Sequence, residues 1–145
     1  METVVKQFNQ LTVEELYEIL RLRAEVFVVE QNCAYQDLDD IDKDAYHVFI
    51  VDEGEIVACA RVIDKGKRLD EVSIGRVISA RRRQGLGTTV MKASIKTAKE
   101  KYSAKKIKIG AQEYAIPFYQ QVGFKVVSDT YLEDGIPHKY MIYEE

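Results

Sequence analysis

Apolar residues recur every three or four positions in two long segments of this chain, and shorter segments alternate between apolar and polar residues or are rich in β-branched residues. The first spacing is typical of a helix with one buried face, and the second pattern is typical of a strand. One helix is predicted from Thr12 to about Val29, because Thr12 and Glu15 form a capping box at its start. A second helix follows near the middle of the chain, with the apolar face Val90, Met91, Ile95 and Ala98.

Strand-like segments surround these helices. Three of them lie between the helices, at residues 47–51, 56–63 and 70–78, and turns with glycine separate them. This spacing predicts an antiparallel meander. Further strands are predicted at 3–8, 107–111, 125–130 and 138–143, and a short helix at 114–122. The pattern predicts an α/β (α+β) fold with a single domain over residues 1–145.

Composition narrows the class of protein. The chain has 145 residues, 46% of them apolar and 31% charged, which is ordinary for a globular domain of this size. A net charge of −3 gives no reason to expect a nucleic-acid partner. The N-terminus shows no signal peptide, and no apolar run reaches the length of a membrane span. We therefore expect a cytoplasmic protein without a membrane partner.

Cysteine and histidine are few. Cys33 and Cys59 form no Cys-x-x-Cys motif, and His47 and His138 lie far apart in the sequence. We therefore expect no metal site and two free thiols.

Residues 30–44 show no periodicity and contain five aspartates, which invites a calcium-binding interpretation. No register of this segment has the glycine and the glutamate that an EF-hand loop requires. A solvated acidic loop is the simpler interpretation. The functional alternative is that the loop attracts a cationic amine. The five residues are Asp37, Asp39, Asp40, Asp42 and Asp44.

The segment 72–101 reads as a strand, a basic glycine turn and a helix. Unpaired N–H groups and the macrodipole make a helix start attractive to anions, and glycine lets the backbone approach a ligand closely. Three consecutive arginines at the turn, Arg81 to Arg83, favour a phosphate ligand. The turn matches neither the dinucleotide fingerprint nor the nucleotide-triphosphate loop.

Residues 82–87, RRQGLG, fit the pattern Gln/Arg-x-x-Gly-x-Gly/Ala. This segment resembles the pyrophosphate-binding loop of the GNAT family of N-acetyltransferases, which bind acetyl-CoA. Residues 115–124, AIPFYQQVGF, resemble a second segment of the same family. The stretches 26–31 and 131–138, together with Arg23, Asp37 and His47, are similar to the ElaA-type branch of that family.

The resemblance implies a GNAT fold, with a mixed, mostly antiparallel sheet of about six or seven strands and helices on both faces. It also implies that the strands ending at Val77 and Ala111 part and that acetyl-CoA, the cosubstrate, lies between them. Gln112 stands where many members have asparagine. The implied cofactor-binding residues are Gly75, Arg76, Val77, Arg82, Arg83, Gln84, Gly85, Leu86, Gly87, Thr88 and Gln112.

Tyr119 matches the tyrosine that protonates the departing CoA thiolate in many members of the family, and a phenol is protonated at neutral pH. A buried aromatic residue on a short helix is the competing interpretation. Glu71 could accept the amine proton, although a surface ion pair is the competing interpretation. His47 is a candidate for the substrate side, and a structural histidine is its alternative. Cys33 has no evident base beside it in the sequence, so a covalent cysteine mechanism is not favoured.

The expected function is acetyl transfer from acetyl-CoA to a primary amine by direct attack. The acceptor is a small molecule or a peptide, and the chain could form a homodimer. The alternative is a module that binds CoA as a sensor without catalysis. The motifs do not specify the acceptor or the length of the acyl chain.

Overall fold

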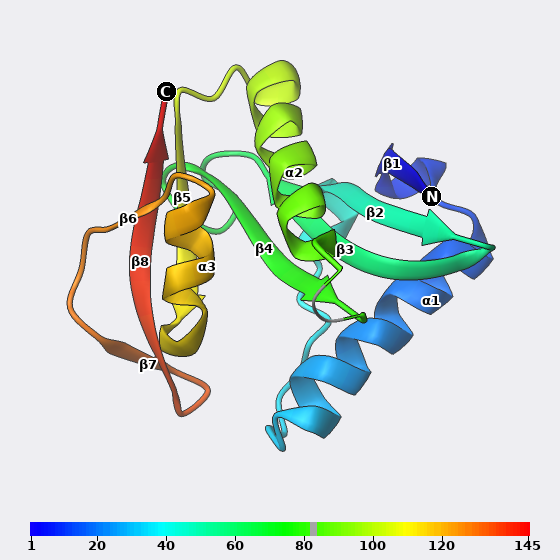
Figure 1. Ribbon diagram of the computed structural model, residues 1–145, viewed down its shortest axis with the longest axis horizontal. Coiled ribbons are helices and arrows are strands. Elements are labelled where there is room, and N and C mark those ends of the chain that lie inside the picture. The colour runs from blue at the N-terminus through cyan, green and yellow to red at the C-terminus, as the bar shows by residue number, and fades with distance from the viewer. Residues whose placement is uncertain (82–83) are drawn as a thin grey trace.

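The computed structural model describes residues 1–81 and 84–145, and it places eight strands in one mixed sheet (Figure 1). The strands are β1 (Glu2–Gln7), β2 (Tyr46–Asp52), β3 (Glu55–Ile63), β4 (Val72–Ser79), β5 (Lys106–Gln112), β6 (Lys125–Val126), β7 (Tyr131–Glu133) and β8 (Ile136–Glu144). The longer helices are α1 (Val13–Arg23), η2 (Ala24–Glu30), α2 (Leu86–Tyr102) and α3 (Ile116–Gln121). Short 3₁₀ turns are η1 (Phe8–Gln10), η3 (Ile41–Asp44) and η4 (Glu113–Ala115).

Strands β1 to β4 pair antiparallel in chain order, which confirms the predicted meander. Helix α2 then crosses over, so that β5 runs parallel to β4. Strand β8 pairs antiparallel with β5, and the sheet order is β1-β2-β3-β4-β5-β8-β6, with β7 also on β8.

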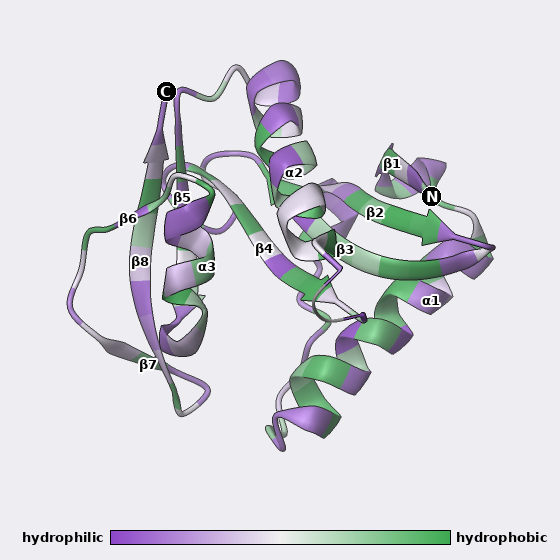
Figure 2. Cartoon of the chain, in the orientation of Figure 1, coloured by the Kyte–Doolittle hydropathy of each residue, from purple (hydrophilic) through white to green (hydrophobic). Residues whose placement is uncertain are grey.

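Helices cover both faces of this sheet (Figure 1). The predicted apolar face of α2, with Val90 and Met91 fully buried, packs on the inward residues of β2 to β5. Helix α1 covers the opposite face with Ile19 and Leu22, against Phe49 of β2 and two further strand residues. Figure 2 shows that the hydrophobic colour concentrates along β2 and β3, between these two layers. In the described part of the chain, no helix is long and apolar enough to cross a membrane.

Three predicted elements differ in detail. The helix predicted to about Val29 changes at Ala24 into the π-helix η2, where Gln31 N–H donates to the carbonyl of Val26, five residues back. Phe8 begins a 3₁₀ turn rather than ending β1. The strand predicted at 125–130 is only the two-residue β6, and the separate β7 follows it, which is why the sheet has eight strands rather than six or seven.

The segment 30–44 is not a solvated acidic loop, because three of its five aspartates are paired with arginines. Arg23 donates to Asp37 (2.8 Å) and to Asp42 (2.7 Å), and all three residues are buried. Arg61, 1% exposed, donates to Asp42 at 2.9 Å. Arg61 also holds both carboxylate oxygens of Asp39, and Arg76 donates to Asp37 at 2.7 Å. We call these six residues the Arg–Asp cluster; it is formally neutral and ties the loop to the sheet.

Acid should weaken this cluster. Burial raises the pKa of Asp39, but the hydrogen bonds and charge of Arg61 outweigh burial and lower it to about 2. Burial also raises the pKa of Asp42, but the hydrogen bonds and charges of Arg23 and Arg61 outweigh this effect, so the pKa of Asp42 is lowered as well. A pKa lower in the folded than in the unfolded chain stabilises the fold above the unfolded pKa of about 4, and this stabilisation is lost as the pH falls toward 2.

We therefore expect the midpoint urea concentration of unfolding to decrease as the pH is lowered from 4 to 2.5. The decrease should be smaller in Asp39→Asn. A midpoint that stays constant over this interval would contradict the ionised cluster.

Candidate active site between β4 and β5

The site begins where two parallel strands separate. Strands β4 and β5 pair only at Val72 with Ile107 and at Ser73 with Lys108, and Figure 1 shows them diverging beyond these pairs. Because β5 has moved away, the edge of β4 that faces it after Ser73 has no strand beside it in the described sheet. Such an edge can pair with an extended ligand through backbone groups.

A β-bulge reorients β4 at the same place. Cys59 faces Ile78 and Arg61 faces Gly75, so that Arg76 and Val77 together oppose one residue of β3. Arg76 has φ +51°, a left-handed conformation that costs roughly 1–2 kcal/mol for a residue with a side chain. Its guanidinium holds both the carboxylate and the carbonyl oxygen of Asp37, which stabilises this conformation.

A cavity of about 810 Å³ lies on one side of the bulge, and we call it the Gly87 cavity. Its wall includes Val77 to Ala80 of β4 and its continuation, Phe118 of α3 and Gly87 in the first turn of α2. Gly85, the residue before α2, has φ +72°, and within the described residues no side chain caps the helix start. A Cβ at Gly87 would touch the Phe118 ring at 3.4 Å, so glycine permits this close approach.

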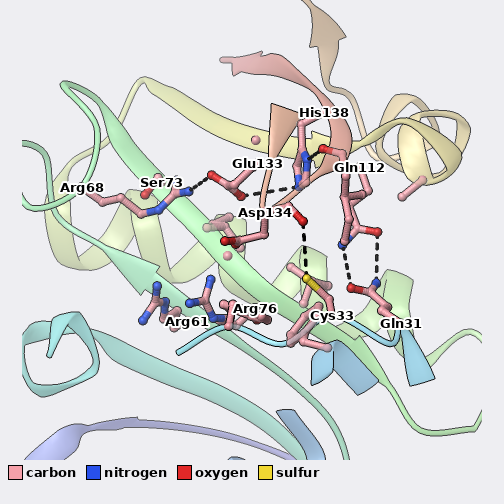
Figure 3. A pocket seen from close by; sticks show the side chains of 18 of the residues that line it. Gln31, Cys33, Arg61, Arg68, Ser73, Arg76, Gln112, Glu133, Asp134 and His138 are labelled. Atoms are coloured by element: carbon pink, nitrogen blue, oxygen red, sulfur yellow. Dashed lines mark hydrogen bonds and ion pairs between the residues drawn. The ribbon is translucent and has the colours of Figure 1, made fainter. Parts of the chain in front are cut away.

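A smaller, polar cavity of about 110 Å³ lies on the other side, and we call it the arginine cavity (Figure 3). Arg61, Ser73 and Gly75 line it from β3 and β4, and Arg68 lines it from the loop between these strands. Loop residues Cys33 and Tyr35 and the β7–β8 turn complete the wall. The Sγ of Cys33 lies 3.5 Å from the carbonyl oxygen of Asp134 in that turn.

The two cavities share a wall. Gln31 and Gln112 form a reciprocal amide pair there, with N–O distances of 3.0 and 3.3 Å (Figure 3). This pair joins the end of η2 to the end of β5 across the separated strands. The residues that line both cavities are Phe27, Gln31, Val77, Gln112, Tyr114, Ala115, Tyr119 and Ile136.

Tyr119 reaches this shared wall from α3. Its ring lies edge-on to Phe118 and Phe124, with centroid distances of 5.1 and 6.0 Å. Burial raises the pKa of Tyr119 well above its usual value of 10, and the nearby Tyr114 adds to this shift. Its phenol is therefore protonated throughout the neutral and mildly alkaline range.

The arginine cavity also contains a chain of polar contacts. Arg68 donates to Glu133 at 3.0 Å, and the second Glu133 oxygen lies 3.5 Å from Nε2 of His138. The other ring nitrogen, Nδ1, lies 2.7 Å from the carbonyl oxygen of Ile136. Since a carbonyl only accepts, Nδ1 carries the hydrogen, and Nε2 of the neutral ring is left as the basic nitrogen. His138 is 5% exposed and stacks on Tyr131.

The structure brings together many of the residues singled out in the sequence. Gly75, Arg76, Val77, Gly87, Gln112 and Tyr119 all line one or both cavities. Gln84 and Thr88 flank the start of α2, and the side chain of Leu86 is buried in the core. Arg82 and Arg83 lie outside the described residues.

Two other predicted residues are not part of either wall. His47 is 2% exposed, and its Nε2 donates to the carbonyl oxygen of Asp42 at 2.8 Å, so it supports the Arg–Asp cluster rather than the substrate side. Burial lowers the pKa of His47, which favours the neutral ring. Glu71 precedes β4 and is absent from the lining of both cavities.

Sequence reasoning assigned no role to Arg61, Ser73, Glu133 or His138. Each stands in an ordinary strand or turn pattern, and only the sheet order places them around one cavity.

Comparisons with known proteins agree with this geometry. Residues 7–145 match the family model "Acetyltransferase (GNAT) domain". A UPF0039 protein of Schizosaccharomyces pombe is 45% identical and covers 99% of this chain and 97% of its own. Escherichia coli ElaA is 41% identical, covering 94% of this chain and 92% of its own.

Solved structures give the same result. The crystal structure of Escherichia coli ElaA superposes with a TM-score of 0.91 at 39% identity over 99% of both chains. That of an acyl-CoA N-acyltransferase from Pseudomonas aeruginosa has a TM-score of 0.90 at 36% identity, also over 99% of both chains. This chain therefore belongs to the GNAT acetyltransferases, in the ElaA-type branch.

Proposed function

We propose that this protein transfers an acetyl group from acetyl-CoA to a primary amine by direct attack, with Tyr119 as the acid for the departing thiolate. The observation that carries the proposal is the shared wall, where Tyr119 and Val77 line both cavities. A thioester entering from one cavity and an amine entering from the other would meet there. Family membership and the Pseudomonas relative described as an acyl-CoA N-acyltransferase support the same reaction.

Residues of this chain would hold the cosubstrate along the open edge of β4 and at the start of α2. Backbone groups of Gly75, Arg76 and Val77 on the open edge of β4 would pair with the amides of the pantetheine arm. N–H groups at the uncapped start of α2, from Gln84 to Thr88, would hold the pyrophosphate, and the arginines predicted from the sequence would add charge. The Gln112 amide is engaged by Gln31, so it would contact the cosubstrate after that pair opens.

In the reaction, the amine nitrogen bonds to the thioester carbon, the carbon–sulfur bond breaks, and a proton leaves the nitrogen. Tyr119 would donate a hydrogen bond and then its proton to the sulfur. A thiol has a pKa of about 8.5, below that of this phenol, so the proton transfer is uphill, and it is completed when the proton taken from the amine returns through solvent to the phenolate. The proton of the amine would go to Nε2 of His138, and Glu133 would pair with the imidazolium that forms.

The base assignment is tested by one pair of variants. His138→Gln should lower kcat/KM by about 10²-fold, since a general base typically contributes 10²- to 10⁴-fold. Glu71→Gln, the base predicted from the sequence, should change kcat/KM less than threefold. The opposite ranking would return the role to Glu71.

The decisive experiment for the function is acetyl-CoA binding by calorimetry, followed by thiol release with a panel of amines. Binding with release for one class of amine would establish the enzyme. Binding without release for every amine would favour a CoA sensor, the alternative that the retained Tyr119 argues against. No binding would mean that the glycine turn and the open edge of β4 have another role.

A further inference from the structure

The arginine cavity contains buried polar atoms that have no partner. Ser73 is 2% exposed, and its hydroxyl makes no hydrogen bond within residues 1–81 and 84–145. Arg61 is 1% exposed, and its Nε is likewise unpaired within the described chain, although its two terminal nitrogens hold Asp39 and Asp42. A buried polar group without a partner costs about 1–3 kcal/mol, so two of them in one cavity wall indicate a ligand.

These two atoms lie on the same side of the sheet. Ile63 pairs with Ser73 and Arg61 pairs with Gly75, so residues 61, 63, 73 and 75 share the face that lines the cavity. A Cβ built on Gly75 meets no atom within 4 Å, so the space over Gly75 is open. The two unpaired groups therefore flank an open position on β4, next to the bulge.

The hydrogen-bonding capacity of the two groups and the charges around them indicate the kind of ligand. Arg61 Nε can only donate, and a serine hydroxyl can donate as well as accept, so both are satisfied together by an oxygen acceptor. Arg68 and Arg76 also line the cavity. The acidic residues of the lining are Glu133, which Arg68 holds, and Asp134, while the aspartates that pair with Arg61 and Arg76 lie outside it. The lining therefore carries three arginines against two carboxylates. This surrounding favours an anionic oxygen and disfavours a second cation.

We infer that the amine acceptor carries a carboxylate, which binds to Ser73 Oγ and Arg61 Nε while its amine lies at the shared wall near Tyr119. The inference rests on the proposed acetyl transfer and names its substrate class, an amino acid whose amine and carboxylate are separated by several bonds. A rise of about 3.3 Å per residue places Ser73 roughly 7 Å from Gly75 along β4 and farther from Val77, so several bonds can separate the carboxylate from the amine. It replaces the cationic acceptor that the aspartates of the loop had suggested, because the Arg–Asp cluster engages three of them.

The test compares acceptors that differ only in the carboxylate. Glycine, β-alanine, 4-aminobutyrate and 5-aminovalerate are each compared with their primary amides and with the alkylamine that lacks the carboxyl group, by thiol release from acetyl-CoA. We expect kcat/KM for the best amino acid to exceed that of the corresponding alkylamine at least tenfold. The reason is that hydrogen bonds to a charged group are stronger than those between neutral groups. Calorimetry with CoA-loaded protein measures binding of the same compounds directly.

Ser73→Ala provides a probe that should leave the fold intact. Removing an unpaired buried hydroxyl should leave the melting temperature unchanged or raise it, and should raise KM for the amino acid about tenfold or more with little effect on the alkylamine. Ser94→Ala is the matched control, because the Ser94 hydroxyl is equally buried but donates to the carbonyl of Val90 at 2.7 Å in α2. That variant should lose stability and keep the wild-type KM.

The outcomes separate this inference from the proposed function. Thiol release that is equal or faster with alkylamines, or a carboxylate preference that Ser73→Ala leaves unchanged, overturns the carboxylate site and leaves acetyl transfer intact. If no amine releases thiol and no amino acid binds to the CoA-loaded protein, that result likewise overturns the carboxylate site. Failure to bind acetyl-CoA removes the proposed function and the inference with it.

Discussion

Replacement of Tyr119 by phenylalanine is expected to lower kcat about 10²-fold or more while the dissociation constant of acetyl-CoA changes less than threefold, because the variant loses only the acid group. The ring itself should stay in place. Tyr119 packs edge-on between Phe118 and Phe124, and phenylalanine keeps these contacts. The loss should therefore appear in single-turnover thiol release and not in the thermal stability of the protein.

The pH dependence sharpens this expectation. The pKa of Tyr119 is raised by burial, so its phenol stays protonated over the whole range in which acetyltransferases are normally assayed. An alkaline limb of the rate profile near pH 9 would therefore belong to another group and should persist in Tyr119→Phe.

Tyr114→Phe is the matched control, because Tyr114 lines the same two cavities but is 76% exposed. We expect near wild-type turnover from it. Full activity of Tyr119→Phe would show that Tyr119 is only a packing residue, and a loss confined to Tyr114→Phe would move the acid role to that tyrosine.

Replacement of Asp42 by asparagine should lower the free energy of unfolding by about 3–5 kcal/mol, because removing one partner leaves a buried charge uncompensated. One Asp42 oxygen accepts from both Arg23 and Arg61. Asparagine keeps the shape of the side chain but leaves three buried or half-buried guanidinium groups with two carboxylates. Such a loss is a large part of the 5–15 kcal/mol that stabilises a typical domain, so it should be evident in urea unfolding.

Asp40→Asn is the control from the same loop. The Asp40 side chain is 87% exposed and pairs only with Lys43 among the described residues, and its left-handed backbone suits asparagine equally well. We expect its effect to stay within about 0.5 kcal/mol. If Asp42→Asn cost no more than this control, the Arg–Asp cluster would not stabilise the fold. A destabilised variant should also lose the arginine cavity, since Arg61 and Arg76 belong to both.

The two cavities depend on contacts between distant parts of the chain. The Gln31–Gln112 pair joins residues 81 positions apart, and the Cys33–Asp134 contact spans 101 positions. Both connect the loop after η2 to the C-terminal half of the sheet.

Elements that depend on local interactions could be predicted from the amino-acid sequence alone. The Thr12 and Glu15 side chains satisfy each other's backbone groups as predicted, the apolar face of α2 is the one read from its three- and four-residue spacing, and the strand spacing predicted the meander. Hydrogen bonds between near neighbours and the period of a helix or strand act over a few residues, so a single chain reveals them. The family could likewise be recognised from the glycine turn and the segment that contains Tyr119.

The contacts between side chains that are distant in the sequence could not be predicted in this way. Five aspartates in a loop look the same whether they face water or buried arginines, and the arginines that pair with them come from α1, β3 and β4. Ser73 and Arg61 sit in ordinary strand patterns, and the pairing of β3 with β4 places them on one face of a cavity. Burial and charge pairing depend on residues that are remote in sequence, and the sheet order brings them together.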